Sequence, residues 1–344
     1  MALNNRRGKL EKLPARKNIR RRAVLTPFEK RLLEHVKLRG LIEPGDRVLV
    51  ALSGGLDSVA LLHLMAAVQP YFKLSIAAAH CNFKLRGRAS TADAALCKRL
   101  CLSLGVQLFT VSFETAKLAA FKKTSIEETA RNLRYEFFGR LAEKHGFTKI
   151  LTAHHQNDNA ETVLFNLFRG ASLLGLHGIR ERRGKIVRPL LFALRDDLAR
   201  YAGEKKFAFR NDRSNDSDVF DRNFIRLKVI PLIETRFKDK LAPSLARLSD
   251  SARELEIFAN RHISSLMTEG QTAFSVRKLQ SLSGFEQKEI FKRVLARFGL
   301  EPNAKMLARL SDLLRTQAGR RVTVSENVEA VWKGTRILFL SAKG

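Results

Sequence analysis

Ser53-Gly54-Gly55-Leu56-Asp57-Ser58 is the stretch that decides the fold of this chain. It follows the apolar run Arg47–Leu52, which has the composition of a buried strand, and it opens the apolar helical pattern Ser58–Val68. The two glycines permit a tight turn that presents backbone N–H groups, and a helix N-terminus adds the positive end of its dipole. The arrangement predicts a site for a phosphate or pyrophosphate group, with Ser53 and Ser58 as hydroxyl donors.

Asp57 lies inside this predicted anion site, where its carboxylate would repel a phosphate unless a cation offsets the charge. It is therefore a candidate Mg²⁺ ligand. Two other phosphate-binding loops are excluded, because the chain has neither GxxxxGK[ST] nor GxGxxG. The alternative that binds no ligand is a plain strand-to-helix turn with a Ser/Asp cap.

Outward from the loop, strand patterns alternate with helical ones. The expected strands are Arg47–Leu52, Leu74–Ala79, Gln107–Val111 and Lys149–Thr152. The expected helices are Ser58–Val68, Thr91–Leu104, Ile126–His145 and His155–Phe168, the third preceded by the capping-box pattern Ser125-x-x-Glu128. This alternation predicts an α/β fold with a doubly wound, Rossmann-like parallel sheet.

Beyond Pro231 the strand alternation stops. Three helical patterns follow, over Leu241–Met267, Phe285–Phe298 and Met306–Leu314, and then two alternating runs, Arg321–Val324 and Val328–Leu340. We expect three parts: a disordered basic arm at residues 1–25, a doubly wound α/β domain at 26–240, and a helical linker with a smaller α+β domain at 241–344.

The composition is that of a strongly basic globular protein. Among 344 residues, 63 are Lys or Arg and 34 are Asp or Glu, a net charge of +29 that favours a polyanionic partner over a merely solvated cationic surface. Residues 1–25 hold many of these basic side chains and a single acid, Glu11. No apolar run is long enough to cross a membrane, and three cysteines without a CxxC pair predict a reducing, cytoplasmic location.

The hexapeptide at residues 53–58 resembles the PP-loop of the N-type ATP pyrophosphatases, which cleave ATP to AMP and pyrophosphate. Further motifs follow in order: His80–Gly87, Glu127–Tyr135, Thr152–Thr162, Arg169-Gly170, Arg188–Leu191, Asp212–Asn215 and Arg222–Arg226. This series resembles the tRNA(Ile)-lysidine synthetases, densely over about residues 45–235 and weakly through the C-terminal part. The resemblance gives no counterpart for the arm.

The resemblance implies a two-step reaction on RNA. ATP adenylates the C2 oxygen of the wobble cytidine in a tRNA(Ile) with a CAU anticodon, and the ε-amine of free L-lysine then displaces AMP to give lysidine. ATP, Mg²⁺, lysine and this tRNA are the implied cofactors and partners. The oligomeric state stays open, with a homodimer as one alternative.

The motifs also imply site residues. The catalytic candidates are Asp57, Arg131, His155, Asp158 and Glu161. The ATP-binding candidates are Ser53, Gly54, Gly55, Leu56, Asp57, Ser58 and His80. The tRNA-binding candidates are Arg86, Arg169, Arg188, Arg222, Asn223 and Arg226, and the Mg²⁺ ligands are Asp57 with Asp158 as a second candidate.

The lysine amine is protonated at neutral pH, so the implied reaction needs a base. Helical spacing puts His155 and Asp158 on one face with Glu161 at its edge, and any of the three could serve. Arg131 and Arg134 suit a developing charge on the α-phosphate. The alternative for the acidic side chains is a solvated first turn of a helix.

The chain departs from the family pattern at several positions. Phe83 stands where a second histidine is frequent, and Asn157 stands where an acid is usual. Two other functions remain open. A tRNA 2-thiolating PP-loop enzyme would usually carry CxxC pairs, whereas Cys97 and Cys101 are spaced CxxxC. A non-catalytic RNA-binding protein would have no reason to keep the loop and the acids intact.

Overall fold

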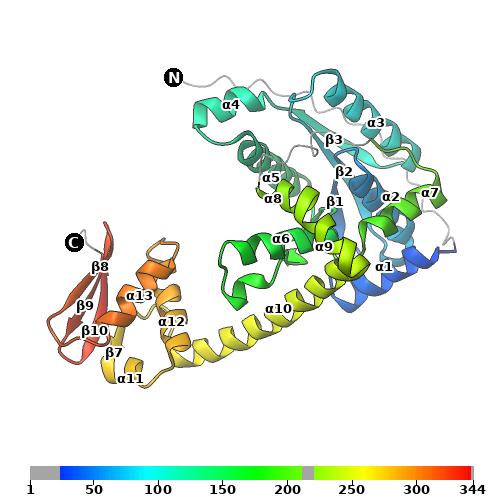
Figure 1. Cartoon of the computed structure of the whole chain (residues 1–344). Coiled ribbons are helices and arrows are strands. Elements are labelled where there is room, and N and C mark those ends of the chain that lie inside the picture. The colour runs from blue at the N-terminus through cyan, green and yellow to red at the C-terminus, as the bar shows by residue number, and fades with distance from the viewer. Residues whose placement is uncertain (1–23, 211–220, 342–344) are drawn as a thin grey trace. The chain divides into compact units, whose positions relative to one another are not determined.

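The computed structural model describes residues 24–210 and 221–341 (Figure 1). The chain divides into two compact units, one ending at Ala252 and the other beginning at Arg253. Helix α10, Leu241–Leu266, runs through this division, whereas the sequence placed a boundary at the start of that helix. The expected arm lies outside the described residues apart from Val24 and Leu25, and so does the Asp212–Asn215 motif.

The first unit is built on a six-stranded sheet with the strand order β3-β2-β1-β4-β6-β5. Strands β1 (Arg47–Ala51), β2 (Ser75–Asn82), β3 (Gln107–Ser112), β4 (Lys149–Leu151) and β6 (Ile186–Val187) are parallel, and β5 (Arg182–Arg183) pairs antiparallel with β6. The predicted doubly wound parallel sheet is confirmed. Strands β5 and β6 were not predicted, because two residues carry no periodicity.

Helices pack on both faces of this sheet (Figure 1). The expected helices form as α2 (Leu56–Phe72), α3 (Arg88–Leu104), α5 (Ile126–His145) and α6 (Gln156–Phe168), and the Ser125 hydroxyl accepts the Glu128 N–H at the start of α5. The sequence analysis did not identify α1 (Pro27–Leu38), α4 (Thr115–Lys122) or α7 (Arg195–Lys205). The chain then continues through a 3₁₀ turn (Leu173–Leu176), α8 (Asp221–Phe224), a π-helical turn (Ile225–Val229), α9 (Ile230–Phe237) and a 3₁₀ turn (Lys238–Lys240).

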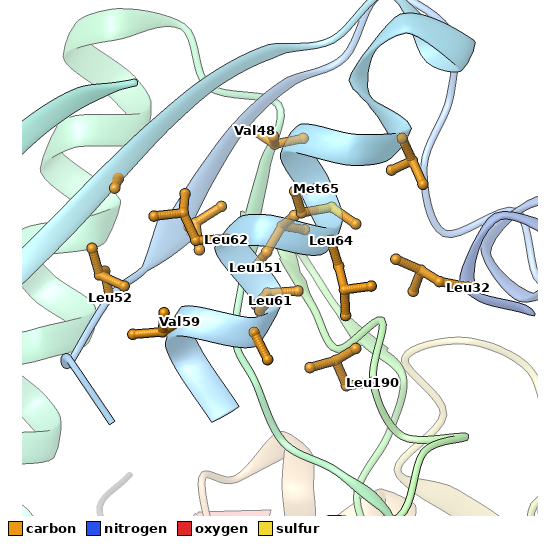
Figure 2. Packing of buried hydrophobic residues seen from close by; sticks show 14 of the residues in the cluster. Leu32, Val48, Leu52, Val59, Leu61, Leu62, Leu64, Met65, Leu151 and Leu190 are labelled. Atoms are coloured by element: carbon orange, nitrogen blue, oxygen red, sulfur yellow. The ribbon is translucent and has the colours of Figure 1, made fainter. Parts of the chain in front are cut away.

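Two hydrophobic cores lie against opposite faces of the sheet at strand β1. Val48 and Val50 face a core formed with α1, α2, α3 and α7, whereas Leu49 faces a core formed with α5. Helix α2 is buried almost all round, with Leu61 and Met65 fully covered (Figure 2). Because β1 and α2 are both fixed by packing, the loop between them is held rigidly at the carboxyl edge of the sheet.

The C-terminal unit is an α+β domain, as the sequence predicted. Its antiparallel sheet has the order β7-β10-β9-β8, formed by β7 (Ala273–Ser275), β8 (Arg321–Ser325), β9 (Val328–Lys333) and β10 (Arg336–Ser341). Its helices include α11 (Val276–Gln280), α12 (Gly284–Arg297) and α13 (Ala304–Leu313). The reading of Val328–Leu340 as one run was wrong, because Gly334, with φ +58°, turns the chain between β9 and β10.

No helix within residues 24–210 and 221–341 is long and apolar enough to cross a membrane.

Candidate active site

The loop between β1 and α2 is organised by its own serine hydroxyls. Ser58 Oγ accepts the N–H groups of Ser53 and Gly54, at 3.1 and 3.2 Å, and it donates to the carbonyl of Gly55 at 3.0 Å. Gly54 has φ +94°, a backbone conformation that residues with a Cβ rarely adopt. Ser58 therefore shapes the loop from inside, while Leu56 begins α2 and points into the core.

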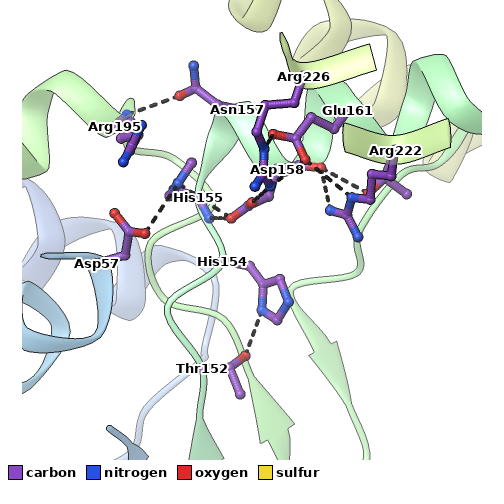
Figure 3. Close-up of polar contacts among 11 residues, drawn as sticks. Asp57, Thr152, His154, His155, Asn157, Asp158, Glu161, Arg195, Arg222 and Arg226 are labelled. Atoms are coloured by element: carbon purple, nitrogen blue, oxygen red, sulfur yellow. Dashed lines mark hydrogen bonds and ion pairs between the residues drawn. The ribbon is translucent and has the colours of Figure 1, made fainter. Parts of the chain in front are cut away.

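Asp57, in the first turn of α2, lies beside the start of α6 (Figure 3). Nε2 of His155 is 3.8 Å from Oδ2 of Asp57 and 3.5 Å from Oδ2 of Asp158. His155 is the N-cap residue of α6, and its N–H donates to Asp158 Oδ2 at 3.0 Å. The cap that begins this helix thus brings two carboxylates and one imidazole together.

The two carboxylates have different electrostatic surroundings. Burial raises the pKa of Asp57, and the charge of Asp158 raises it further, against the opposing effect of His155. Burial would also raise the pKa of Asp158, but the charge of His155 and the His155 N–H outweigh it and lower the value. Asp57 is therefore the carboxylate that gains more from a nearby cation.

Glu161, one turn further along α6, is buried and engaged by two arginines. Nε and Nη2 of Arg226 lie 2.6 and 2.8 Å from its two oxygens, and Nε of Arg222 lies 3.2 Å away (Figure 3). Arg226 also lies 3.6 Å from Asp158. These arginines were predicted to bind tRNA, and in the structure they hold the acids of α6 in place.

A pocket of about 330 Å³ opens beside the loop at the carboxyl edge of the sheet. It is lined by residues of β1, the loop, α2, the end of β2, α5, the segment between β4 and α6, and α6 itself. They include Ser53, Asp57, Ser58, Cys81, Phe83, Arg134, Tyr135, Phe138, Thr152, His154 and Asp158. A strand-end pocket with a phosphate-type loop and two carboxylates is suited to a nucleotide and a second substrate.

His154 lies in the wall of this pocket and was not among the predicted site residues. Its Nδ1 is 3.0 Å from the hydroxyl of Thr152 (Figure 3). Burial and the nearby arginines lower the pKa of His154 to about 4, although Asp158 opposes this. The imidazole is therefore neutral at pH 7.

Several predicted residues do not line the pocket. His80 is buried behind the loop, where Nδ1 contacts the Leu52 carbonyl at 2.9 Å. Arg86 is paired with Asp93 at 2.7 Å, and Arg188 is buried with Nη1 2.6 Å from the Arg180 carbonyl. Arg169, at the end of α6, is exposed and lies over the ring of Phe165.

Two other predicted residues remain near the site. Arg131 is exposed on α5 with its guanidinium 5.3 Å from the ring centroid of Tyr135, a side chain of the pocket wall. Asn223 lies between Arg222 and Arg226 in the segment that contacts α6. The structure thus gathers Ser53, Gly55, Asp57, Ser58 and Asp158 around the pocket, and His155 contacts the two carboxylates.

The sequence analysis missed a contact that holds the loop from behind. The N–H of Arg210 donates to the Gly54 carbonyl at 3.0 Å, and Nε of Arg210 lies 2.7 Å from Asp93 on α3. The high arginine content of the chain is the one sequence signal for such a contact, and it does not indicate that Arg210 pairs with Asp93.

Magnesium fits the donor set at Asp57. Its Oδ1 is buried and has no hydrogen-bond partner among the described residues. In the described part of the chain no group of three or more His, Cys, Asp or Glu side chains could enclose a metal ion. Mg²⁺ needs no such cage, because it commonly uses one or two carboxylates together with substrate phosphates and water.

This combination of a parallel sheet, a Ser-Gly-Gly loop and strand-end carboxylates defines a PP-loop nucleotide-binding domain. Residues 24–233 match the family model described as "PP-loop domain". A U34-tRNA thiolase from Methanococcus maripaludis, solved with its [4Fe-4S] cluster, covers 66% of this chain and 80% of its own, with a TM-score of 0.53 and 16% identity. That likeness concerns the fold alone.

Relatives with higher sequence identity define the family more narrowly than the shared fold does. The tRNA(Ile)-lysidine synthase of Chlorobaculum tepidum is 48% identical over 88% of this chain and 93% of its own length. The synthase of Thermosipho africanus is 37% identical over 83% of this chain and 66% of its own, and that of Bacteroides thetaiotaomicron is 39% identical over 73% and 58%. The chain belongs to the tRNA(Ile)-lysidine synthase family of PP-loop proteins. It spans nearly all of the first relative and about two thirds or less of the other two.

Proposed function

We propose that this chain joins L-lysine to C2 of the wobble cytidine of a tRNA(Ile) with a CAU anticodon, using ATP and releasing AMP and pyrophosphate. The observation that supports the proposal is the pocket in which the Ser58-organised loop faces the carboxylates of Asp57 and Asp158. Such a site can hold a nucleotide phosphate chain on one side and a cationic amine on the other.

In the first step the loop and the N-terminus of α2 bind the phosphates of ATP, and the C2 oxygen of cytidine attacks the α-phosphate while pyrophosphate leaves. Asp57, whose Oδ1 has no hydrogen-bond partner among the described residues, would hold Mg²⁺. When bound there, Mg²⁺ supplies positive charge that offsets the phosphates. The guanidinium of Arg131, on α5, adds a second positive charge that can offset the negative charge of the phosphates.

In the second step the lysine amine forms a bond to C2 as the bond from C2 to the AMP oxygen breaks. We assign Asp158 to binding the ε-ammonium, and His155 in its neutral form, whose Nε2 lies 3.5 Å from Oδ2 of Asp158, to taking the proton. Glu161 is less suited to be the base, because Arg222 and Arg226 engage both of its oxygens. Glu161 is assigned to holding the site together.

The C-terminal unit supplies a basic surface for the RNA backbone. A hollow of about 870 Å³ in that unit is lined by the basic residues Arg309, Arg315, Arg320 and Arg321. Asp312 is the acidic residue of the same lining. Phosphate contacts of this kind give affinity that falls with added salt but do not identify a base. Exposed Arg169 offers a further contact in the first unit, and we place the reaction in the cytoplasm, where tRNA and ATP are abundant.

The thiolating alternative lacks support from the described residues. All three cysteines are free thiols: Cys97 and Cys101 are buried in the core and Cys81 is half-buried, so no described pair of cysteines is arranged to relay sulfur. Burial also raises the pKa of all three thiols to about 12, which leaves them unreactive near neutral pH.

The test is incorporation of radiolabelled lysine into a CAU-anticodon tRNA(Ile) transcript in the presence of ATP and Mg²⁺. We expect stoichiometric incorporation, and none into a transcript with a UAU anticodon. Asp57→Asn should abolish incorporation while tRNA binding in a filter assay stays within about 2-fold, because charge and not packing is changed. Absence of both lysine incorporation and ATP–pyrophosphate exchange in the wild-type protein would refute the proposal.

A further inference from the structure

Two phenylalanines stack where neighbouring strands end. Phe83 follows β2 and Phe113 follows β3, and their ring centroids lie 5.8 Å apart with an angle of 22° between the planes. The N–H of Phe113 donates to the Asn82 carbonyl at 2.8 Å, which extends the strand pairing by one step. Backbone pairing therefore fixes the position of both rings, each of which is half-buried.

The guanidinium of Arg134 lies over this aromatic pair. Its central carbon is 5.3 Å from the centroid of the Phe83 ring, and Arg134 reaches this position from α5. Phe83 and Arg134 both belong to the lining of the nucleotide pocket. A cation over an aromatic face is held by the ring's quadrupole, which restricts a long side chain that would otherwise sample many rotamers.

Arg134 carries the positive charge of the pocket wall. Among the described residues that line the pocket, it is the one arginine or lysine. The nearby guanidinium groups of Arg222 and Arg226 are occupied by Glu161. Within residues 24–210 and 221–341 no carboxylate forms an ion pair with Arg134, so its charge is directed to whatever anion enters the pocket.

We propose that Phe83, supported by Phe113, is a positioning residue that holds the Arg134 guanidinium against the phosphate chain of ATP. The inference rests on the proposed function in that ATP is the ligand. It gives the aromatic side chain at position 83 a function of its own, where a histidine is frequent in the family. Phe83 itself needs no polar contact with substrate, because it acts through Arg134.

The test is a double-mutant cycle on nucleotide affinity. We expect Phe83→Leu to weaken binding of α,β-methylene-ATP by about 3-fold to 30-fold, the effect of losing one partly exposed cation–π contact. Arg134→Met should weaken it by at least as much. Phe83→Leu added to Arg134→Met should change affinity by less than about 2-fold, because the residue through which it acts is already gone.

Two control variants accompany the cycle, one that keeps an aromatic ring at position 83 and one that changes a phenylalanine away from the pocket. Phe83→Tyr keeps the ring face and should restore affinity to within about 2-fold of wild type. Phe121→Leu, a change at an exposed phenylalanine of α4 that does not line the pocket, should leave affinity unchanged. Thermal melting identifies any variant that has lost its fold.

Independent effects of Phe83→Leu and Arg134→Met would overturn the inference, as would wild-type affinity in Phe83→Leu. The affinity cycle needs neither lysine nor tRNA. It therefore decides the inference even if lysine incorporation fails and the proposed function is refuted.

Discussion

Arg226 and Glu161 form a two-point ion pair, with Nε 2.6 Å from Oε1 and Nη2 2.8 Å from Oε2. The pair joins the π-helical turn at residues 225–229 to α6, so two segments far apart in sequence meet at the site. Glu161 has only 4% of its side chain exposed, whereas Arg226 has 34%. The carboxylate therefore depends on its arginines more than they depend on it.

Arg226→Met should lower the free energy of unfolding by about 2 kcal/mol, because it leaves a buried carboxylate with fewer partners. Adding Glu161→Gln to that variant should recover about half of the loss, since the buried charge is then gone. Arg140→Met is the matched control: its pair with Glu136 lies on the surface of α5 with each side chain 59% exposed, and we expect a change below about 0.5 kcal/mol. Urea denaturation measures all three, and a double variant less stable than Arg226→Met alone would contradict the argument.

The Ser58 hydroxyl leads to a second prediction. Ser58→Ala removes the acceptor of two loop N–H groups, so we expect ATP–pyrophosphate exchange to fall by about 10-fold to 100-fold with little change in tRNA affinity. Ser103→Ala removes a hydroxyl that bonds only within α3 and should leave exchange unchanged. Equal exchange rates for the two variants would show that Ser58 does not organise the loop.

Local sequence patterns were sufficient to predict the fold around the loop. The Ser53–Ser58 hexapeptide, the buried run at residues 47–52 and the helical periodicities that follow all depend on neighbours in the chain, and each formed as expected. The strand β7 escaped prediction because its three residues gain a partner only when β10 lies beside them.

The parts of the site that were not predicted depend on contacts between distant segments. Nothing near Arg210 indicates that its N–H will meet the Gly54 carbonyl, and nothing near Phe83 indicates that Phe113 will stack on it. His80 lies near the end of β2, a strand that reaches the pocket, yet its side chain turns toward the Leu52 carbonyl and does not line the pocket. Strand periodicity specifies alternating faces, but only the packed structure shows which face the pocket uses.

Gly178 leads to a third prediction, which concerns the loop after α6. A Cβ at this position would lie 2.1 Å from Oδ1 of Asn159, an atom that already accepts the Ile179 N–H at 2.7 Å. Gly178→Ala should therefore cost about 3 kcal/mol or more of unfolding free energy, the sum of strain at positive φ and a displaced hydrogen bond.

Gly184→Ala separates those two causes. Gly184 has φ +58°, close to the +62° of Gly178, but a Cβ there would meet nothing within 4 Å. We expect a cost of about 1 kcal/mol from the backbone conformation alone. If chemical denaturation gave the two variants equal stability, the contact with Asn159 would carry no energy.

Glu29, in the first turn of α1, leads to a prediction about pH. Its Oε1 accepts the hydroxyl of Tyr201 at 2.8 Å and lies 2.8 Å from Nζ of Lys205, both on α7. Burial alone would raise the pKa of Glu29, but these two contacts and the N–H of Thr26 outweigh it and lower the value from the ordinary 4.5. A carboxyl whose pKa is lower in the folded state stabilises the fold above its unfolded value and loses that effect as pH falls through the folded value.

Glu29→Gln should therefore lower the free energy of unfolding by about 1 to 2 kcal/mol at pH 7. The difference from wild type should shrink below about pH 4.5, because the wild-type carboxyl then begins to take up a proton in the unfolded chain. Glu34→Gln, at an exposed position of the same helix, should show no such trend. Urea denaturation from pH 3 to pH 8 measures both variants. A Glu29→Gln effect that stays constant over this range would mean that shape and hydrogen bonding, and not the charge of Glu29, join α1 to α7.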